Sequence, residues 1–185
     1  MKSIVKTVYI ICSLVFLIYL APPNIDFPEK PPNSLQSDEP GDTESTLRRA
    51  YFTDLTREEV VKHYTGQMKL DPFLGYKLPN YKLNYPPEEA FGIIRDQTRS
   101  TFLEEILYPL RESLFVNGFV PKEDKDRIFI NEKEWKQKIT VRYIPSNIFH
   151  RLLIGIFTIF LIPFLAARAI YSVGKLKSAL QGLWT

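Results

Sequence analysis

The sequence predicts a membrane protein in which two transmembrane helices flank a small α+β domain, with a mixed sheet and two to three helices. Three observations support this fold class. All 21 acidic residues lie between Asp26 and Glu134, whereas both ends combine long apolar runs with basic residues only. Residues 22–48 are rich in proline and acids. Residues 49–145 carry the periodic patterns of a folded domain.

The first apolar run predicts a transmembrane helix at residues 4–21, after a short tail at residues 1–3. A bilayer core about 30 Å thick needs about 20 helical residues. Lys6 fits such a helix because its long side chain reaches the headgroups. A secretory signal peptide has the same general form, but the end of this run lacks a small-x-small cleavage site. We therefore expect an uncleaved anchor.

The second apolar run predicts a transmembrane helix at residues 151–174, after an interfacial linker at residues 146–150. Pro163 removes a backbone donor and predicts a kink. Arg168 lies one or two turns from the far end, where its side chain reaches the interface. The basic amphipathic tail at residues 175–185 predicts an interfacial helix or, alternatively, the end of the spanning helix. The predicted membrane-anchoring residues are Lys6, Arg151, Arg168, Lys175, Lys177 and Trp184.

The charges beside the first span predict the topology. Lys2 and Lys6 precede this span and an acid-rich stretch follows it, which favours a cytoplasmic N-terminus. Two spans place both termini on the same side. We therefore expect a multi-pass protein of the cytoplasmic membrane, with both termini cytoplasmic, residues 22–150 extracytoplasmic, and the lipid bilayer as a partner.

Residues 22–48 are predicted to be a flexible tether. They contain six of the 14 prolines and six acidic residues. Such a composition buries too little apolar surface to offset chain entropy, and proline stiffens the chain toward extended conformations. The folded extracytoplasmic domain is expected to follow at residues 49–145.

The first half of this domain has signals for strands and helices. RAYFT predicts a strand, and Thr56 with Glu59 predicts a capping box for the helix REEVVKHYTGQM. Residues 81–85 alternate as a strand does. Prolines followed by acids predict a second helix, PEEAFGIIRDQT.

The second half predicts a helix followed by a hairpin. FLEEILYPLRESLFVNGF has helical spacing, with Glu104, Glu105 and Glu112 on the polar face and Asn117-Gly118 as a left-handed stop. Pro109 should kink or split this helix, and a strand is the alternative for part of the stretch. DRIFIN and KQKITVRYIP are predicted to pair as a hairpin.

No known catalytic or cofactor motif occurs in the sequence. It contains no G-x-G fingerprint, P-loop, G-x-S-x-G elbow or H-E-x-x-H helix. One cysteine and two histidines exclude a zinc site with the usual ligands. Residues 49–145 hold 16 basic and 15 acidic residues, without a basic run for nucleic acid. We therefore expect no cofactor, no metal and no nucleic-acid partner, and we favour a non-enzymatic role.

These observations favour a module for protein–protein interaction in the cell envelope, which binds another envelope protein or associates with itself. Tyrosine is common at interfaces, and the predicted contact surface consists of Tyr76, Tyr81 and Tyr85. One alternative is a membrane-tethered hydrolase or ligand-binding module whose site follows no known motif. Another is a subunit of an oligomeric pore, for which only Thr158 and Ser172 supply polar groups in the second span.

Overall fold

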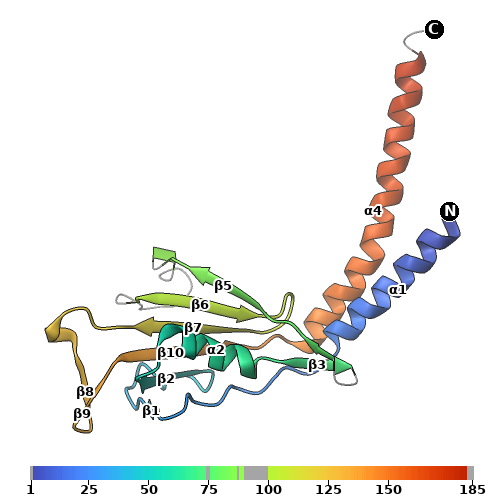
Figure 1. Ribbon diagram of the computed structural model, residues 1–185. Helices are drawn as coiled ribbons and strands as arrows, with labels where there is room; N and C mark the ends of the chain where they lie inside the picture. The colour runs from blue at the N-terminus through green and yellow to red at the C-terminus, as the bar shows by residue number, and fades with distance from the viewer. Residues whose placement is uncertain (1, 74–75, 87, 90–99, 183–185) are drawn as a thin grey trace. The chain divides into compact units, whose positions relative to one another are not determined.

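The computed structural model describes residues 2–73, 76–86, 88–89 and 100–182 (Figure 1). The chain divides into two compact units. One contains Met1–Pro22 and Asn147–Thr185, and the other contains Pro23–Ser146. We call them the helical unit and the sheet domain. Both ends of the chain therefore belong to one unit, and the residues between them form the other.

The helical unit consists of α1 (Lys2–Leu20) and α4 (Ile148–Gly182). By length and composition, both helices are suited to cross a membrane, and few of their side chains are buried. This supports the predicted membrane location. α4 begins before the predicted span and continues beyond it, and Pro163 lies within this one continuous helix. Asn147 caps its start, since its side-chain oxygen accepts hydrogen bonds from the N–H groups of Phe149 and His150 at 2.9 and 3.3 Å.

The two helices pack against each other within their unit. At Gly155, an added Cβ would lie 2.5 Å from Leu20 Cδ1, so a larger residue would require the Leu20 side chain or the helices to shift. The Tyr9 hydroxyl donates a hydrogen bond to the Ile159 carbonyl of α4 at 2.5 Å. Small residues and interhelical hydrogen bonds are the means by which helices associate in lipid. α1 and α4 therefore form a helical hairpin.

The sheet domain is built on a six-stranded sheet in the order β1-β2-β10-β7-β6-β5. Its strands are β1 (Leu35–Gln36), β2 (Arg48–Thr53), β5 (Tyr81–Tyr85), β6 (Phe102–Leu107), β7 (Ser113–Phe119) and β10 (Gln137–Ile144). All five pairings are antiparallel, so the predicted mixed sheet is wrong. Parallel pairs need crossover connections, whereas β6 and β7 are joined by a tight hairpin.

One helix covers one face of this sheet. α2 (Arg57–Gln67) buries Val60, Val61 and Tyr64. It begins with the predicted capping box, since the Thr56 side chain and Glu59 satisfy each other's backbone N–H groups. The core below it includes the buried sheet residues Ile106, Leu114, Val116, Ile139 and Val141.

Short elements complete the domain. β3 (Leu70–Phe73) pairs with β4 (Tyr76–Leu78), and β8 (Ile128–Ile130) pairs with β9 (Lys133–Trp135) after the 3-10 turn Asp124–Asp126. DRIFIN and KQKITVRYIP therefore both contain strands, but the predicted hairpin between them is wrong. β8 pairs with β9, which is formed by the intervening KEW. β10 pairs with β2 on one side and with β7 on the other.

The predicted helix over residues 102–119 is wrong, because the stretch forms the antiparallel strands β6 and β7. Pro109 separates them at a turn instead of kinking a helix. Strands buried on both faces have near-continuous apolar runs, which spacing alone does not distinguish from a helix. Gly118 is not a helix stop; it lies opposite Phe102, whose ring occupies the space that a Cβ would need.

Part of the predicted tether lies along the domain. Its β1 pairs with β2, and Pro28 and Pro31 are buried. Phe27 makes an edge contact with Tyr143 at 6.3 Å between ring centroids. The segment thus finds apolar partners on the sheet. Most of the helix predicted from PEEAFGIIRDQT lies outside the described residues.

Candidate functional site

β5 forms one edge of the six-stranded sheet. β6 pairs with it on one side, and no strand among the described residues pairs with it on the other. Because side chains alternate along a strand, Tyr81, Leu83 and Tyr85 share one face, and Lys82 and Asn84 share the other. Tyr81 is 56% exposed and Leu83 is 44% exposed. We call residues 81–85 the β5 edge; in the described part of the chain no strand pairs with its outer side, and one of its faces is apolar.

Tyr85 fixes one end of this edge to the neighbouring strands. Its hydroxyl donates a hydrogen bond to Glu105 Oε2 at 2.6 Å. This hydrogen bond, together with burial, raises the pKa of Tyr85 to about 12. The ring packs on the buried pair Leu103 and Phe115. Tyr85 is therefore held by the sheet, whereas Tyr81 and Leu83 are available for contact.

The structure brings together two of the three tyrosines predicted as a contact surface. Tyr81 and Tyr85 lie on the same face of β5. Tyr76 begins β4, which pairs with β3 in a separate two-stranded sheet. The sequence analysis missed Leu83, although the alternation in YKLNY places it between the two tyrosines.

A cleft of about 630 Å³ lies between α2 and the opposite face of β5 and β6. Its wall contains the Glu104 side chain, which is 2% exposed. Glu104 Oε1 accepts a hydrogen bond from Arg57 Nε at 3.0 Å, while Oε2 is buried without a hydrogen-bond partner in the described part of the chain. The basic residues that line the cleft are Arg57, Lys62, Lys69 and Lys82. The cleft is thus a mainly basic surface around one buried carboxylate.

Glu104, Glu105 and His63 each have hydrogen-bond partners among the described residues. Glu104 and Glu105 point to opposite faces of β6, so their carboxylates do not converge. His63 Nε2 lies 2.6 Å from Gln67 Nε2 and 3.2 Å from the Glu29 carbonyl oxygen. Residues 2–73, 76–86, 88–89 and 100–182 contain no cluster of three or more His, Cys, Asp or Glu side chains suited to a metal ion.

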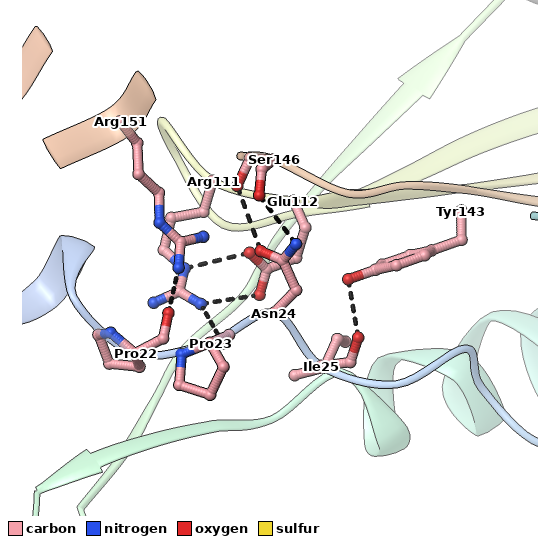
Figure 2. Close-up of polar contacts among 9 residues, drawn as sticks. All are labelled: Pro22, Pro23, Asn24, Ile25, Arg111, Glu112, Tyr143, Ser146 and Arg151. Atoms are coloured by element: carbon pink, nitrogen blue, oxygen red, sulfur yellow. Dashed lines mark hydrogen bonds and ion pairs between the residues drawn. The ribbon is translucent and has the colours of Figure 1, made fainter. Parts of the chain in front are cut away.

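A buried ion pair lies at the end of the sheet domain where the chain continues into both helices (Figure 2). Arg111 Nη2 and Glu112 Oε1 are 3.0 Å apart, and both side chains are 0% exposed. The same Arg111 nitrogen donates a hydrogen bond to the Pro23 carbonyl at 3.0 Å. The pair therefore fixes the first residue of the sheet domain to the β6–β7 hairpin.

Two further hydrogen bonds hold the chain segments at this end of the domain. Asn24 Nδ2 donates to the Ser146 carbonyl at 2.8 Å, which joins the second residue of the domain to its last residue (Figure 2). The Tyr143 hydroxyl donates to the Ile25 carbonyl at 2.8 Å. The segments that lead to α1 and α4 therefore leave the domain side by side.

The predicted membrane-anchoring residues lie on the two helices as far as the structure describes them. Lys6, Arg168 and Lys175 are exposed. Arg151 is instead buried, and its guanidinium donates a hydrogen bond to the Pro22 carbonyl within the helical unit. Lys177 belongs to α4, but its side chain lies outside the described residues, as does Trp184.

The sequence analysis missed the buried roles of Arg111 and Glu112. It placed Glu112 on the polar face of a helix, whereas both residues belong to a hairpin. Adjacent opposite charges are common on protein surfaces, so their sequence carries no signal of burial. Comparisons of the chain with protein-family models, curated proteins and solved structures find no match.

Proposed function

We propose that the chain is a membrane-anchored assembly module of the cell envelope, which associates with a second copy of itself through the β5 edge. In this proposal α1 and α4 span the cytoplasmic membrane, with both termini cytoplasmic and residues 22–150 extracytoplasmic. The lengths and apolar composition of the two helices support the anchoring. The basic residues before α1 support the orientation.

The observation that carries the proposal is the exposed β5 edge, whose outer side pairs with no strand among the residues that the structure describes. An edge strand presents a row of free N–H and C=O groups that pair readily with a strand of another chain. Proteins commonly protect such an edge with charges or proline. β5 carries one such charge, Lys82, beside two exposed apolar side chains, Tyr81 and Leu83. The edge thus favours strand pairing with a partner.

The sequence of β5 is compatible with pairing to its own copy. A twofold axis through Leu83 would place Leu83 opposite its equivalent, Tyr81 opposite Tyr85, and Lys82 opposite Asn84. This register aligns the apolar faces of the two strands and puts no like charges directly opposite each other. A twofold interface requires this kind of self-complementarity. We therefore favour a second copy over a different protein as the occupant of the edge.

The proposal is tested by Leu83→Lys in the full chain, reconstituted in lipid nanodiscs. The substitution would put two ammonium groups opposite each other at the twofold axis, and like charges in this position destabilise pairing. Within one chain the new lysine would lie beside Glu105, the β6 partner of residue 83, so the fold should tolerate it. We expect the wild type to be dimeric and Leu83→Lys to be monomeric by native mass spectrometry.

Phe129→Lys is the matched control, because Phe129 is also an exposed apolar strand residue, at 61% exposure, but lies on β8. This variant should dimerise like the wild type. A monomeric wild type, or equal dimerisation of all three proteins, would contradict the proposal. If a photo-crosslinker at Tyr81 captured a different envelope protein and no second copy, self-association would be wrong as well.

A second candidate function is ligand binding in the cleft beside α2. The buried Glu104 Oε2 favours it, because a buried carboxylate oxygen normally has a hydrogen-bond donor. A ligand with an anionic group for Lys62, Lys69 or Lys82 and a hydroxyl or amine for Glu104 would fit this surface. Calorimetry with sugar phosphates tests this candidate: binding that Lys69→Gln weakens would support it, and the lack of any binding heat would count against it.

A further inference from the structure

The turn between β6 and β7 exposes a leucine in an unusual backbone conformation. The Arg111 N–H donates a hydrogen bond to the Tyr108 carbonyl at 2.9 Å, which closes a four-residue turn. Pro109 in its second position and a φ of 61° at Leu110 in its third are typical of a type II turn. The third position of such a turn favours glycine or asparagine, and leucine is strained there.

Packing within the domain does not account for this leucine. Leu110 is 69% exposed, so its side chain gains little from burial in the fold. Pro109 beside it is exposed too. We call Pro109 and Leu110 the hairpin tip. Strain at an exposed apolar residue indicates a role outside the folded core.

The hairpin tip lies at the end of the domain from which both membrane helices continue. Arg111, the next residue, is bonded through its side chain to the Pro23 carbonyl, and Asn24 is bonded to Ser146 (Figure 2). Leu20, the last residue of α1, is only three residues before Pro23 in the sequence. Because an extended chain advances at most about 3.6 Å per residue, Pro23 lies within about 11 Å of the end of α1.

We propose that the hairpin tip inserts Leu110 into the interface of the bilayer that holds α1 and α4. This inference rests on the membrane anchoring in the proposed function. The exposed positions of the turn carry no charge, whereas the charged side chains of Arg111 and Glu112 are buried behind them. Ile144, at the end of β10, adds a further apolar side chain that is partly exposed at this end.

The interface would stabilise the tip by removing the leucine side chain from water. The buried ion pair gives the tip a fixed position, since it ties the hairpin to Pro23. The contact would thereby limit how the sheet domain tilts on the membrane.

The test uses spin labels on single cysteines in the full chain, reconstituted in vesicles of phosphatidylcholine and phosphatidylglycerol. Cys12 is the chain's one cysteine, so Cys12→Ser provides the background. Labels are placed by Leu110→Cys at the tip, Phe129→Cys as the exposed control in the same domain, and Phe160→Cys within α4. Collision rates of each label with oxygen and with a water-soluble nickel complex report its depth in the bilayer.

We expect the label at residue 110 to have an oxygen-to-nickel collision ratio several times that of the label at 129, and the label at 160 to lie in the hydrocarbon. Equal ratios at 110 and 129, with residue 160 in the hydrocarbon, would overturn the tip insertion alone. A water-exposed label at 160 would overturn the membrane anchoring and the inference together. If the residue 110 variant does not fold, Ile144→Cys replaces it, with the same expected and contradicting results.

Discussion

The buried pair of Arg111 and Glu112 provides a quantitative test of how the hairpin holds the end of the domain. Glu112→Gln removes a carboxylate that lies 3.0 Å from Arg111 Nη2, with both side chains fully buried. The guanidinium would then be a buried charge without this counterion. Breaking a buried ion pair in this way costs about 3–5 kcal/mol. Arg111→Met should cost a similar amount, because it leaves the carboxylate buried.

The double variant, Arg111→Met with Glu112→Gln, should be more stable than the sum of the two single losses predicts. Replacing both charges also removes the buried ion that each single variant leaves without the other member of the pair, so the coupling energy should reach about 2 kcal/mol or more. Urea unfolding of the full chain in micelles measures these changes. Fluorescence of the buried Trp135 in a Trp184→Phe background reports on the sheet domain alone.

A loss of about 3 kcal/mol in the free energy of unfolding would lower the urea concentration at the midpoint of unfolding by about 1 M or more. This follows because the free energy of unfolding typically falls by about 1–3 kcal/mol per molar urea. Glu123→Gln is the matched control, because its partner Lys125 forms an ion pair with it on the exposed surface at 2.6 Å. Exposed pairs contribute about 0–1 kcal/mol. Single losses in the free energy of unfolding below about 1 kcal/mol, which simply add in the double variant, would show that the buried pair does not stabilise the domain in this way.

Three further predictions concern packing and titration. Gly118→Ala should cost about 1–3 kcal/mol in the same urea assay because its Cβ would collide with the Phe102 ring, and adding Phe102→Leu should recover part of the loss. Tyr85 has a folded-state pKa of about 12, whereas tyrosine normally ionises near 10, so the free energy of unfolding should fall as the pH rises from about 10 to 12. Tyr85→Phe should make this fall in the free energy of unfolding smaller. Gly155→Leu should separate α1 from α4, measured as a longer distance between spin labels on the two helices.

The sequence predicted correctly the features that depend on local signals. The capping box of Thr56 and Glu59 identified α2, because both partners lie within one helical turn. The alternation at residues 81–85 identified β5. The length of the apolar runs identified two helices suited to span a membrane, since this property depends on composition alone.

The errors arose where tertiary pairing decides the structure. The stretch from Phe102 to Phe119 has apolar residues at helical spacing, but its strands are buried on both faces, so the spacing does not discriminate. Pro109 was the residue that pointed to a break. The turn that places Leu110 after Pro109 in a left-handed backbone conformation was not predictable, because leucine is rare at the third position of such a turn.

The candidate site was predicted only in part for the same reason. Tyr81 and Tyr85 belong to a strand that local alternation reveals, whereas the position of β5 at the sheet edge depends on the order of all the strands. The buried Arg111 is hydrogen-bonded to Pro23, which is far away in the sequence. Such long-range contacts leave no pattern that a single sequence shows.

Disulfide crosslinking through the β5 edge in membranes, in the Cys12→Ser background, tests directly whether two copies pair through this edge. Residues directly opposite each other in antiparallel strands have Cβ atoms about 4.5–5.5 Å apart, close to the span of a disulfide. We expect Leu83→Cys to form a crosslinked dimer on mild oxidation, and Tyr81→Cys to crosslink with Tyr85→Cys in a mixed sample. Lack of a dimer with Leu83→Cys, or equal crosslinking with Phe129→Cys, would contradict the claim that two copies pair through this edge.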